Sequence, residues 1–246
     1  MKWAIAIAAV LAVWALASVA AGGALVPSPL VTGREIVRML GEGAVWRDAS
    51  ITLFRGAAGL ALAFVVGLAL GIPCGLNRAV YDVLSSVMFA VQGCPTILWI
   101  SLLMVWVGLG SVVPIVAVFL ATVPVLFMNA AQGTASLDPR LFAMARVYRA
   151  SRWRVIRRII LPGLSSYVLA GFSFALGVSW KVTATAEFIA SSSGIGSRIY
   201  WSYRLLDMNR LFGWAVILIG FGMFLEMKVI RPLRRRVEDE RRSAGG

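Results

Sequence analysis

The sequence contains no histidine and only two cysteines, Cys74 and Cys94, both in or beside long apolar runs. Zinc sites use histidine or grouped cysteines as ligands, and many hydrolases use histidine as their base. Neither pattern occurs, so the sequence predicts no metal site, no disulfide framework and no nucleophile paired with histidine. We expect both cysteines to be small buried apolar side chains.

Lysine is nearly as scarce, because Lys2, Lys181 and Lys228 are the only three, and none of them follows a glycine. The phosphate-binding loop of many ATPases requires a lysine in the pattern G-x-x-x-x-G-K-[ST]. The chain therefore lacks such an ATP site of its own, and no pair of carboxylates stands out. We expect a protein that is not an enzyme and that binds no cofactor by itself.

Charged residues make up only 14% of the 246 residues, whereas 60% are hydrophobic and the mean hydropathy is +0.85. A soluble domain usually has about a quarter charged residues. The excess of apolar side chains has no solution in water, so the composition predicts an all-α integral membrane protein.

Six apolar stretches are long enough to cross a bilayer, because about 20 helical residues span its ~30 Å core. They cover about residues 4–24, 50–74, 83–107, 112–130, 163–186 and 211–230. The first could also be a signal peptide, but it is longer than a typical h-region, and we favour an uncleaved helix. The third is interrupted at residues 93–95, which are Gly-Cys-Pro.

The second stretch contains glycines at positions 56, 59, 67 and 71, a spacing that lets helices approach closely. It also contains Arg55, which we expect to be an anchor at the membrane interface.

The basic residues are unevenly distributed: 24 Lys and Arg oppose 11 Asp and Glu, and they crowd into residues 140–158 and 228–242. Basic segments beside apolar spans usually lie in the cytoplasm, which predicts that both termini are cytoplasmic. Because no aromatic residues are interleaved with the basic tail, we expect no nucleic-acid binding. The tail, residues 231–246, is expected to lie against membrane lipids.

The segment between the fourth and fifth spans is too long for a plain connection. Residues 131–160 hold seven arginines and one acid, with apolar side chains at helical intervals. Two interpretations remain open from this pattern. The segment is an amphipathic helix that binds lipid headgroups, or it is a docking helix for a soluble motor protein.

Residues 137–162 (LDPRLFAMARVYRASRWRVIRRIILP) resemble the "EAA" loop of bacterial ATP-binding-cassette importer permeases. The motif runs E-A-A, three residues, G, nine residues, then I-x-L-P. Its spacing is kept throughout, with the motif positions occupied by Ala143, Met144, Ala145, Arg149, Ile159, Leu161 and Pro162.

Two positions depart from the motif. Ala143 replaces the glutamate, which removes a salt-bridge or capping partner. Arg149 replaces a glycine that typically supplies a left-handed turn, so we expect a continuous helix or a different turn here. Both departures predict a divergent ATPase partner.

The resemblance extends over about residues 25–230 and is to the permease subgroup for sulfonates, taurine, nitrate and bicarbonate, which pyrimidine-type vitamin precursor importers share. It is carried in order by Val-Pro-Ser-Pro at 26–29, Ser-Ile-Thr-Leu at 50–53 with Arg55, Gly-Leu-Gly at 108–110, Ser-Trp-Lys at 179–181, Ala-Glu-Phe at 186–188 and Gly-Ile-Gly at 194–196.

The resemblance implies a type I importer transmembrane fold, with residues 1–246 as one permease domain, a coupling-helix loop at about 131–162 and the cytoplasmic tail. It implies a second permease copy, two cytoplasmic ATPase subunits that bind ATP and Mg²⁺, and an extracytoplasmic substrate-binding protein, all at a bacterial cytoplasmic (inner) membrane. The residues expected to couple to the ATPase are Ala143, Met144, Ala145, Arg149, Arg152, Arg154, Ile159, Leu161 and Pro162.

The substrate path is expected to be lined by polar or large side chains of the third and fifth spans: Gln92, Thr96, Trp99, Met104, Trp180, Lys181 and Glu187. An alternative interpretation of the four residues of the third span is that they only pack between helices. Lys181 either attracts an anionic substrate or extends toward the lipid headgroups.

The substrate is therefore expected to be a small anion or a pyrimidine-type vitamin precursor. Two other classes of function remain. A self-contained channel or secondary transporter would transport without ATPase partners, and would not need the helix at residues 138–162. A scaffold or membrane-integral enzyme is the third possibility, although the sequence has no catalytic constellation.

Overall fold

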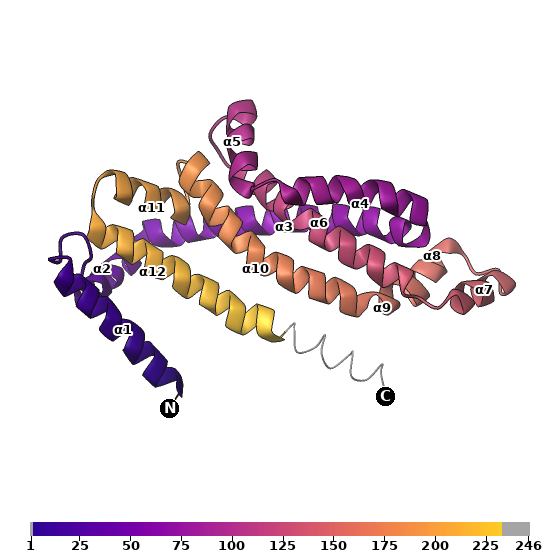
Figure 1. The fold of residues 1–246 in the computed structure, drawn as a ribbon, viewed down its shortest axis with the longest axis horizontal. Helices are drawn as coiled ribbons and strands as arrows, with labels where there is room; N and C mark the ends of the chain where they lie inside the picture. Colours follow the sequence, from indigo (N-terminus) through magenta and orange to yellow (C-terminus); the bar gives the residue numbers. More distant parts are fainter. Residues whose placement is uncertain (1, 233–246) are drawn as a thin grey trace.

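The computed structural model describes residues 2–232, with side chains from residue 8 onward, and all regular elements in this part are helices (Figure 1). In chain order they are α1 (Lys2–Ala20), α2 (Pro29–Leu40), α3 (Gly43–Leu76), α4 (Arg78–Gly93), α5 (Thr96–Val107), α6 (Val112–Ala135), α7 (Pro139–Val147), α8 (Arg152–Val155), the π-helical turn η1 (Ile156–Ile160), α9 (Leu161–Gly163), α10 (Ser165–Ala190), α11 (Ile195–Arg204), α12 (Met208–Leu225) and the π-helical turn η2 (Glu226–Ile230).

Four helical stretches of the described chain are long and apolar enough to cross a membrane: Gly43–Leu76, Val112–Ala135, Ser165–Ala190 and Met208–Ile230. The pair α4 and α5 forms a fifth span if it is counted as one, although it bends by 89°. The bend lies at Cys94 and Pro95, so the predicted interruption of the third span is confirmed. Helix α1 lies in the first predicted span, and the part of it whose side chains the structure describes, Ala8–Ala20, is apolar.

Helices α3 and α6 form the closest helix pair of the bundle because glycines of α3 face the backbone of α6. A Cβ atom at Gly67 would lie 2.8 Å from Leu126 Cβ, and one at Gly71 would lie 2.7 Å from Ala130 Cβ. Gly59 and Gly75 approach α6 in the same way. The predicted close approach is confirmed, since a side chain at these positions would separate the helices.

Helix α10 lies beside α3 and α6 and completes the core. A Cβ atom at Gly56 of α3 would lie 3.0 Å from Thr183 Oγ1 of α10. The core between these helices and α5 contains side chains with no exposed surface, among them Ala63, Ile100 and Val118. Helices α3, α6 and α10 therefore pack as one unit. Because lipid is as apolar as their side chains, close packing between the helices holds them together.

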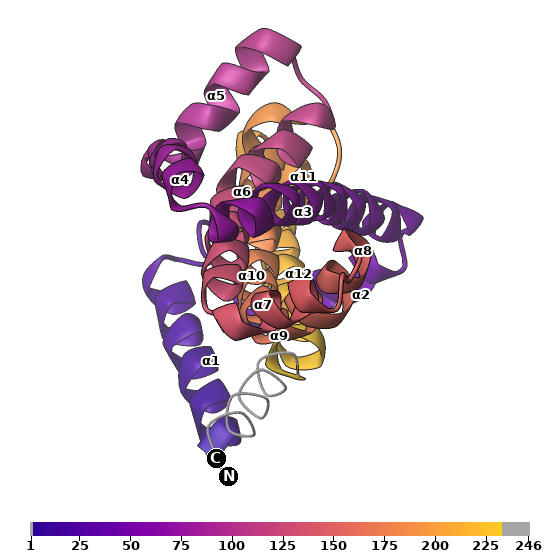
Figure 2. The same cartoon turned by 90° about the vertical axis from the view of Figure 1, so that its right-hand side faces the viewer.

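The two ends of the bundle carry different elements. Helices α2 and α11 lie together at one end with the start of α12, and α7 and α8 project from the opposite end (Figure 1). Helix α1 leans away from the bundle in both views (Figure 2). It is held through Trp14, whose ring stacks on Phe212 at 6.0 Å and whose Nε1 donates to Pro27 O at 3.1 Å. The expectation for the basic tail concerns residues 231–246, nearly all of which lie outside the described residues.

Candidate functional site

The segment that resembles the coupling loop begins with a capped helix. Asp138 has an extended backbone and its Oδ1 accepts a hydrogen bond from the backbone N–H of Arg140 at 2.8 Å. Pro139 follows in the first turn, where its missing N–H costs nothing. The sequence Asp-Pro therefore fixes where α7 begins, with three residues between it and the end of α6 at Ala135.

Helix α7 ends in a left-handed turn at Arg149, whose φ is +47°. The N–H of Ala150 donates to Ala145 O at 2.9 Å, and the N–H of Arg149 donates to Arg146 O at 3.0 Å. This pair of hydrogen bonds defines the Schellman motif, in which glycine usually occupies the left-handed position. The prediction that arginine would give a continuous helix or a different turn is therefore wrong, because the hydrogen bonds hold the turn despite the Cβ atom.

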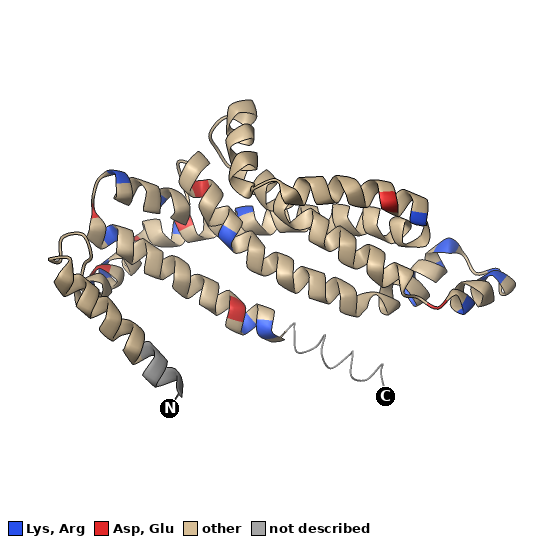
Figure 3. Cartoon of the chain, in the orientation of Figure 1, with Lys and Arg blue, Asp and Glu red and all other residues tan. Residues whose placement is uncertain are grey.

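The surface of this segment combines positive charge with apolar side chains. All seven of its arginines are exposed, and none of them forms an ion pair within residues 8–232. Tyr148 and Trp153 are 77% and 67% exposed. Figure 3 shows the basic positions grouped around α7 and α8 at one end of the molecule. Such a surface has unused hydrogen-bond donors and apolar area for a partner.

Two grooves run beside α7 and α8. One, of about 650 Å³, is lined by Met144, Ala145, Arg154, Ile159 and Pro162 of the expected coupling residues. The other, of about 580 Å³, is lined by Ala145, Arg149 and Arg152. Ala143 and Leu161 are exposed but line neither groove. The turn at Arg149 thus brings most of the expected residues to two adjoining surfaces.

The expected path residues of the third span lie around the bend between α4 and α5. Gln92 is exposed, and Thr96 is half-buried at the start of α5. Trp99 Nε1 donates to Val91 O at 3.2 Å, a hydrogen bond that joins the two halves across the bend. Met104 packs against the main hydrophobic core. Of these four residues, Gln92 alone is exposed.

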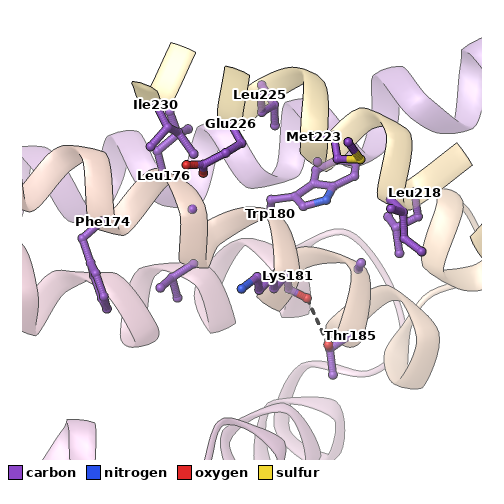
Figure 4. A pocket seen from close by; sticks show the side chains of 15 residues that line it. Phe174, Leu176, Trp180, Lys181, Thr185, Leu218, Met223, Leu225, Glu226 and Ile230 are labelled. Atoms are coloured by element: carbon purple, nitrogen blue, oxygen red, sulfur yellow. Dashed lines mark hydrogen bonds between the residues drawn. The ribbon is translucent and has the colours of Figure 1, made fainter. Parts of the chain in front are cut away.

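The expected path residues of the fifth span separate into two environments on α10. Trp180 and Lys181 line a cavity of about 620 Å³ between α10 and α12, and Trp180 stacks on Phe221 at 4.7 Å (Figure 4). Glu187 has no exposed surface and forms an ion pair with Arg55 at 2.8 Å. Glu187 is therefore a member of an internal polar cluster, and only Trp180 and Lys181 border open space.

Arg55 is the centre of that cluster, since its side chain is 3% exposed and all its nitrogens have acceptors. Besides Glu187, it donates to Ser111 Oγ at 2.9 and 3.1 Å, to Ser193 O at 2.7 Å and to Ser193 Oγ at 2.9 Å. It thereby joins α3 to the beginning of α6, to α10 and to the loop after α10. The expectation that Arg55 is an anchor at the membrane interface is wrong, because Arg55 is buried inside the bundle, where the carboxylate of Glu187 neutralises its charge.

The same cluster binds the beginning of α11. The N–H groups of Gly194, Ile195 and Gly196 donate to Asp48 Oδ1, Thr52 Oγ1 and Glu187 Oε2 at 3.2, 2.9 and 3.2 Å. These are N–H groups that a helix leaves without intrahelical partners, and carboxylates at this position are also favoured by the helix dipole. The loop before α11 is therefore held against α3 and α10. Gly194, with a φ of +96°, makes the turn that allows this.

Asp48 and Arg198 form the second ion pair of this region at 2.6 Å, and Asp48 is fully buried. The sequence carried a signal for the cluster, since charges inside apolar spans usually pair with one another. Arg55 and Glu187 are such a pair of opposite sign, separated by 132 residues. The sequence does not show that the two residues are in contact, because the contact depends on how α3 and α10 pack.

Comparison with known proteins gives a consistent group of similar chains. Residues 63–237 match the family described as binding-protein-dependent transport system inner membrane component. The taurine transport system permease protein TauC of Escherichia coli is 26% identical over 196 residues, which cover 80% of this chain and 71% of that protein. The putative aliphatic sulfonates transport permease protein SsuC of Bacillus subtilis is 26% identical over 222 residues, 90% of this chain and 80% of that protein.

A third similar chain is the bicarbonate transport system permease protein CmpB of Synechococcus elongatus, 28% identical over 189 residues, 76% of this chain and 67% of that protein. Among solved structures, a chain of the inward-facing MetNI methionine ABC transporter superposes with a TM-score of 0.62. At 16% identity it covers 78% of this chain and 94% of that chain, so the likeness is one of fold.

Proposed function

Because the chain belongs to the family of binding-protein-dependent transport system inner membrane components, we propose that it is the permease subunit of an ATP-binding-cassette importer for a small anion. Its fold is that of a type I importer permease. The similar chains named for taurine, aliphatic sulfonates and bicarbonate support the substrate class, since each of these compounds carries an anionic group.

The observation that carries the coupling role is the exposed, unpaired basic surface of α7 and α8. In this proposal a cytoplasmic ATPase subunit binds ATP and Mg²⁺, and seats α7 in a cleft of its surface. The grooves beside α7 and α8 accept side chains of that subunit. Movement of the ATPase subunits is then carried into α6 and α10, which directly flank the segment.

The remaining parts of the proposal concern assembly and topology. Two copies of the chain enclose the path, a substrate-binding protein delivers the solute from outside, and both termini lie in the cytoplasm of a bacterium. The topology follows from placing the basic residues of 140–158 on the cytoplasmic side. A self-contained channel or secondary transporter is not favoured, because the matched family is one of binding-protein-dependent systems.

The test is purification of the chain from its native membranes in mild detergent, with mass spectrometry of the proteins that accompany it. We expect a stoichiometric soluble protein with a phosphate-binding loop. It should be lost from a variant with Arg152→Glu and Arg154→Glu, and kept with Arg204→Glu, an exposed position on α11 at the other end. Retention by the double variant would refute the docking role, and absence of the ATPase from the wild-type chain would refute the importer.

A further inference from the structure

Lys181 lies inside a membrane-spanning helix, and the described part of the chain provides no ion pair for it. It lies 16 residues after the beginning of α10 at Ser165 and 9 residues before its end at Ala190. At 1.5 Å per residue these are about 24 Å and about 14 Å along the helix axis. The four-carbon stem of lysine is much shorter than either distance, so the ammonium group does not reach the end of the helix.

The surroundings of Lys181 contrast with those of Arg55. Arg55 is paired with Glu187 and almost fully buried. Lys181 is exposed, and no carboxylate of residues 8–232 forms an ion pair with it. A charged group at membrane depth faces the interior of a bundle or a water-filled cavity, because lipid cannot solvate it. The unpaired ammonium group is therefore available to a solute.

The cavity beside Lys181 has the character of a site for an organic anion. Its volume of about 620 Å³ lies within the range of small-molecule sites. Most of its lining is apolar, with Phe174 and Trp180 contributed by α10 and Leu218 and Met223 by α12 (Figure 4). A strongly hydrated inorganic anion gains nothing from such walls, whereas a short alkyl chain does.

We infer that Lys181 binds the sulfonate group of a short alkanesulfonate in the cavity between α10 and α12, with the alkyl chain against the apolar walls. The inference rests on the proposed importer function. It adds Lys181 as the residue that favours negatively charged substrates. Glu226, at the start of η2, lines the same cavity, and Figure 4 shows no hydrogen bond between it and Lys181. Lysine acts here as a point charge, so an arginine at the same position retains attraction for the anion.

The experiment measures initial uptake of radiolabelled ethanesulfonate by cells of the native organism in which each variant replaces the chromosomal copy. Uptake is normalised to the amount of chain in the membrane, and the ATPase that accompanies each variant is determined from the same cells. The variants are Lys181→Met, Lys181→Arg and a matched control, Lys228→Met. Lys228 is exposed in η2 and does not line the cavity.

We expect Lys181→Met to lower normalised uptake by about ten- to a hundredfold, the effect of losing one hydrogen bond to a charged group. Lys181→Arg should keep most of the uptake, and Lys228→Met should match the wild-type chain. Unchanged uptake by Lys181→Met, or an equal loss in Lys228→Met, would overturn the role of Lys181. A wild-type chain that retains its ATPase but takes up no ethanesulfonate would overturn the sulfonate assignment alone. Absence of the ATPase would instead refute the importer function itself.

Discussion

The substitution Glu187→Gln removes one negative charge from the buried cluster and changes the shape of the side chain little. Glu187 has no exposed surface and the Arg55 side chain is 3% exposed, so the guanidinium group left behind keeps its charge without its partner. Removing one member of a buried ion pair costs about 3–5 kcal/mol, because the other charge has already lost its water. We therefore expect the free energy of unfolding to fall by about 3–5 kcal/mol.

The assay is thermal unfolding of the purified chain in detergent. A loss of that size corresponds to a fall of roughly 6–20 °C in Tm for a chain of 150–250 residues. The matched control is Arg38→Met, which removes an ion pair with Glu35 at 3.6 Å whose arginine is 65% exposed. Exposed pairs contribute about 0–1 kcal/mol, so the control should change Tm by a few degrees at most.

A second variant separates charge from packing. In Arg55→Gln with Glu187→Gln both charges are gone and amide groups remain for the hydrogen bonds, so we expect a higher Tm than that of Glu187→Gln alone. The reasoning is refuted if Glu187→Gln lowers Tm no more than Arg38→Met does, or if the doubly substituted chain is no more stable than the single variant.

Two further predictions concern backbone geometry, and both are measured as changes in Tm. Arg149→Gly should stabilise the chain by about 1 kcal/mol by relieving the left-handed turn, whereas Arg146→Gly, inside α7, should destabilise it by a similar amount; equal effects of the two would contradict the strain. Gly71→Ala should destabilise by about 1–3 kcal/mol, because the new Cβ would lie 2.7 Å from Ala130 Cβ. Gly33→Ala, in α2 with nothing within 4 Å, should instead stabilise by about 0.5–1 kcal/mol, and a loss at both glycines would exclude a packing cause.

Most of the spans were predictable because they are continuous apolar runs, and the bend after α4 was predictable because Gly93 and Pro95 interrupt the third run. The contacts of the α3 glycines were also predictable in kind, since their spacing places them on one helix face. The partner helix was not, because nothing in a glycine spacing identifies what it faces. Only the structure shows that most of these glycines face α6 and that Gly56 faces α10.

The turn at Arg149 shows why one residue type is a weak guide to backbone conformation. The prediction of a continuous helix or a different turn rests on the cost of a left-handed residue other than glycine, about 1 kcal/mol or more. In the structure two backbone hydrogen bonds close the turn, with donors at Arg149 and Ala150. Their acceptors are carbonyl groups that would otherwise lack partners at the helix end, so the motif outweighs the unfavourable residue.

The glycine contacts between α3 and α6 extend from Gly59 to Gly75, which is about 24 Å along the helix axis. Over that length the glycines of α3 lie directly against backbone and Cβ atoms of α6, so we expect the two helices to move as one rigid body. Helix α7 begins at Pro139, with three residues between it and the end of α6. At the other end of this helix pair, Arg55 of α3 donates to Ser111 at the beginning of α6 and to Ser193 in the loop before α11. We expect a displacement of α7 to reach the loop before α11 as a common tilt of α3 and α6, because the pair is connected to these segments at its two ends.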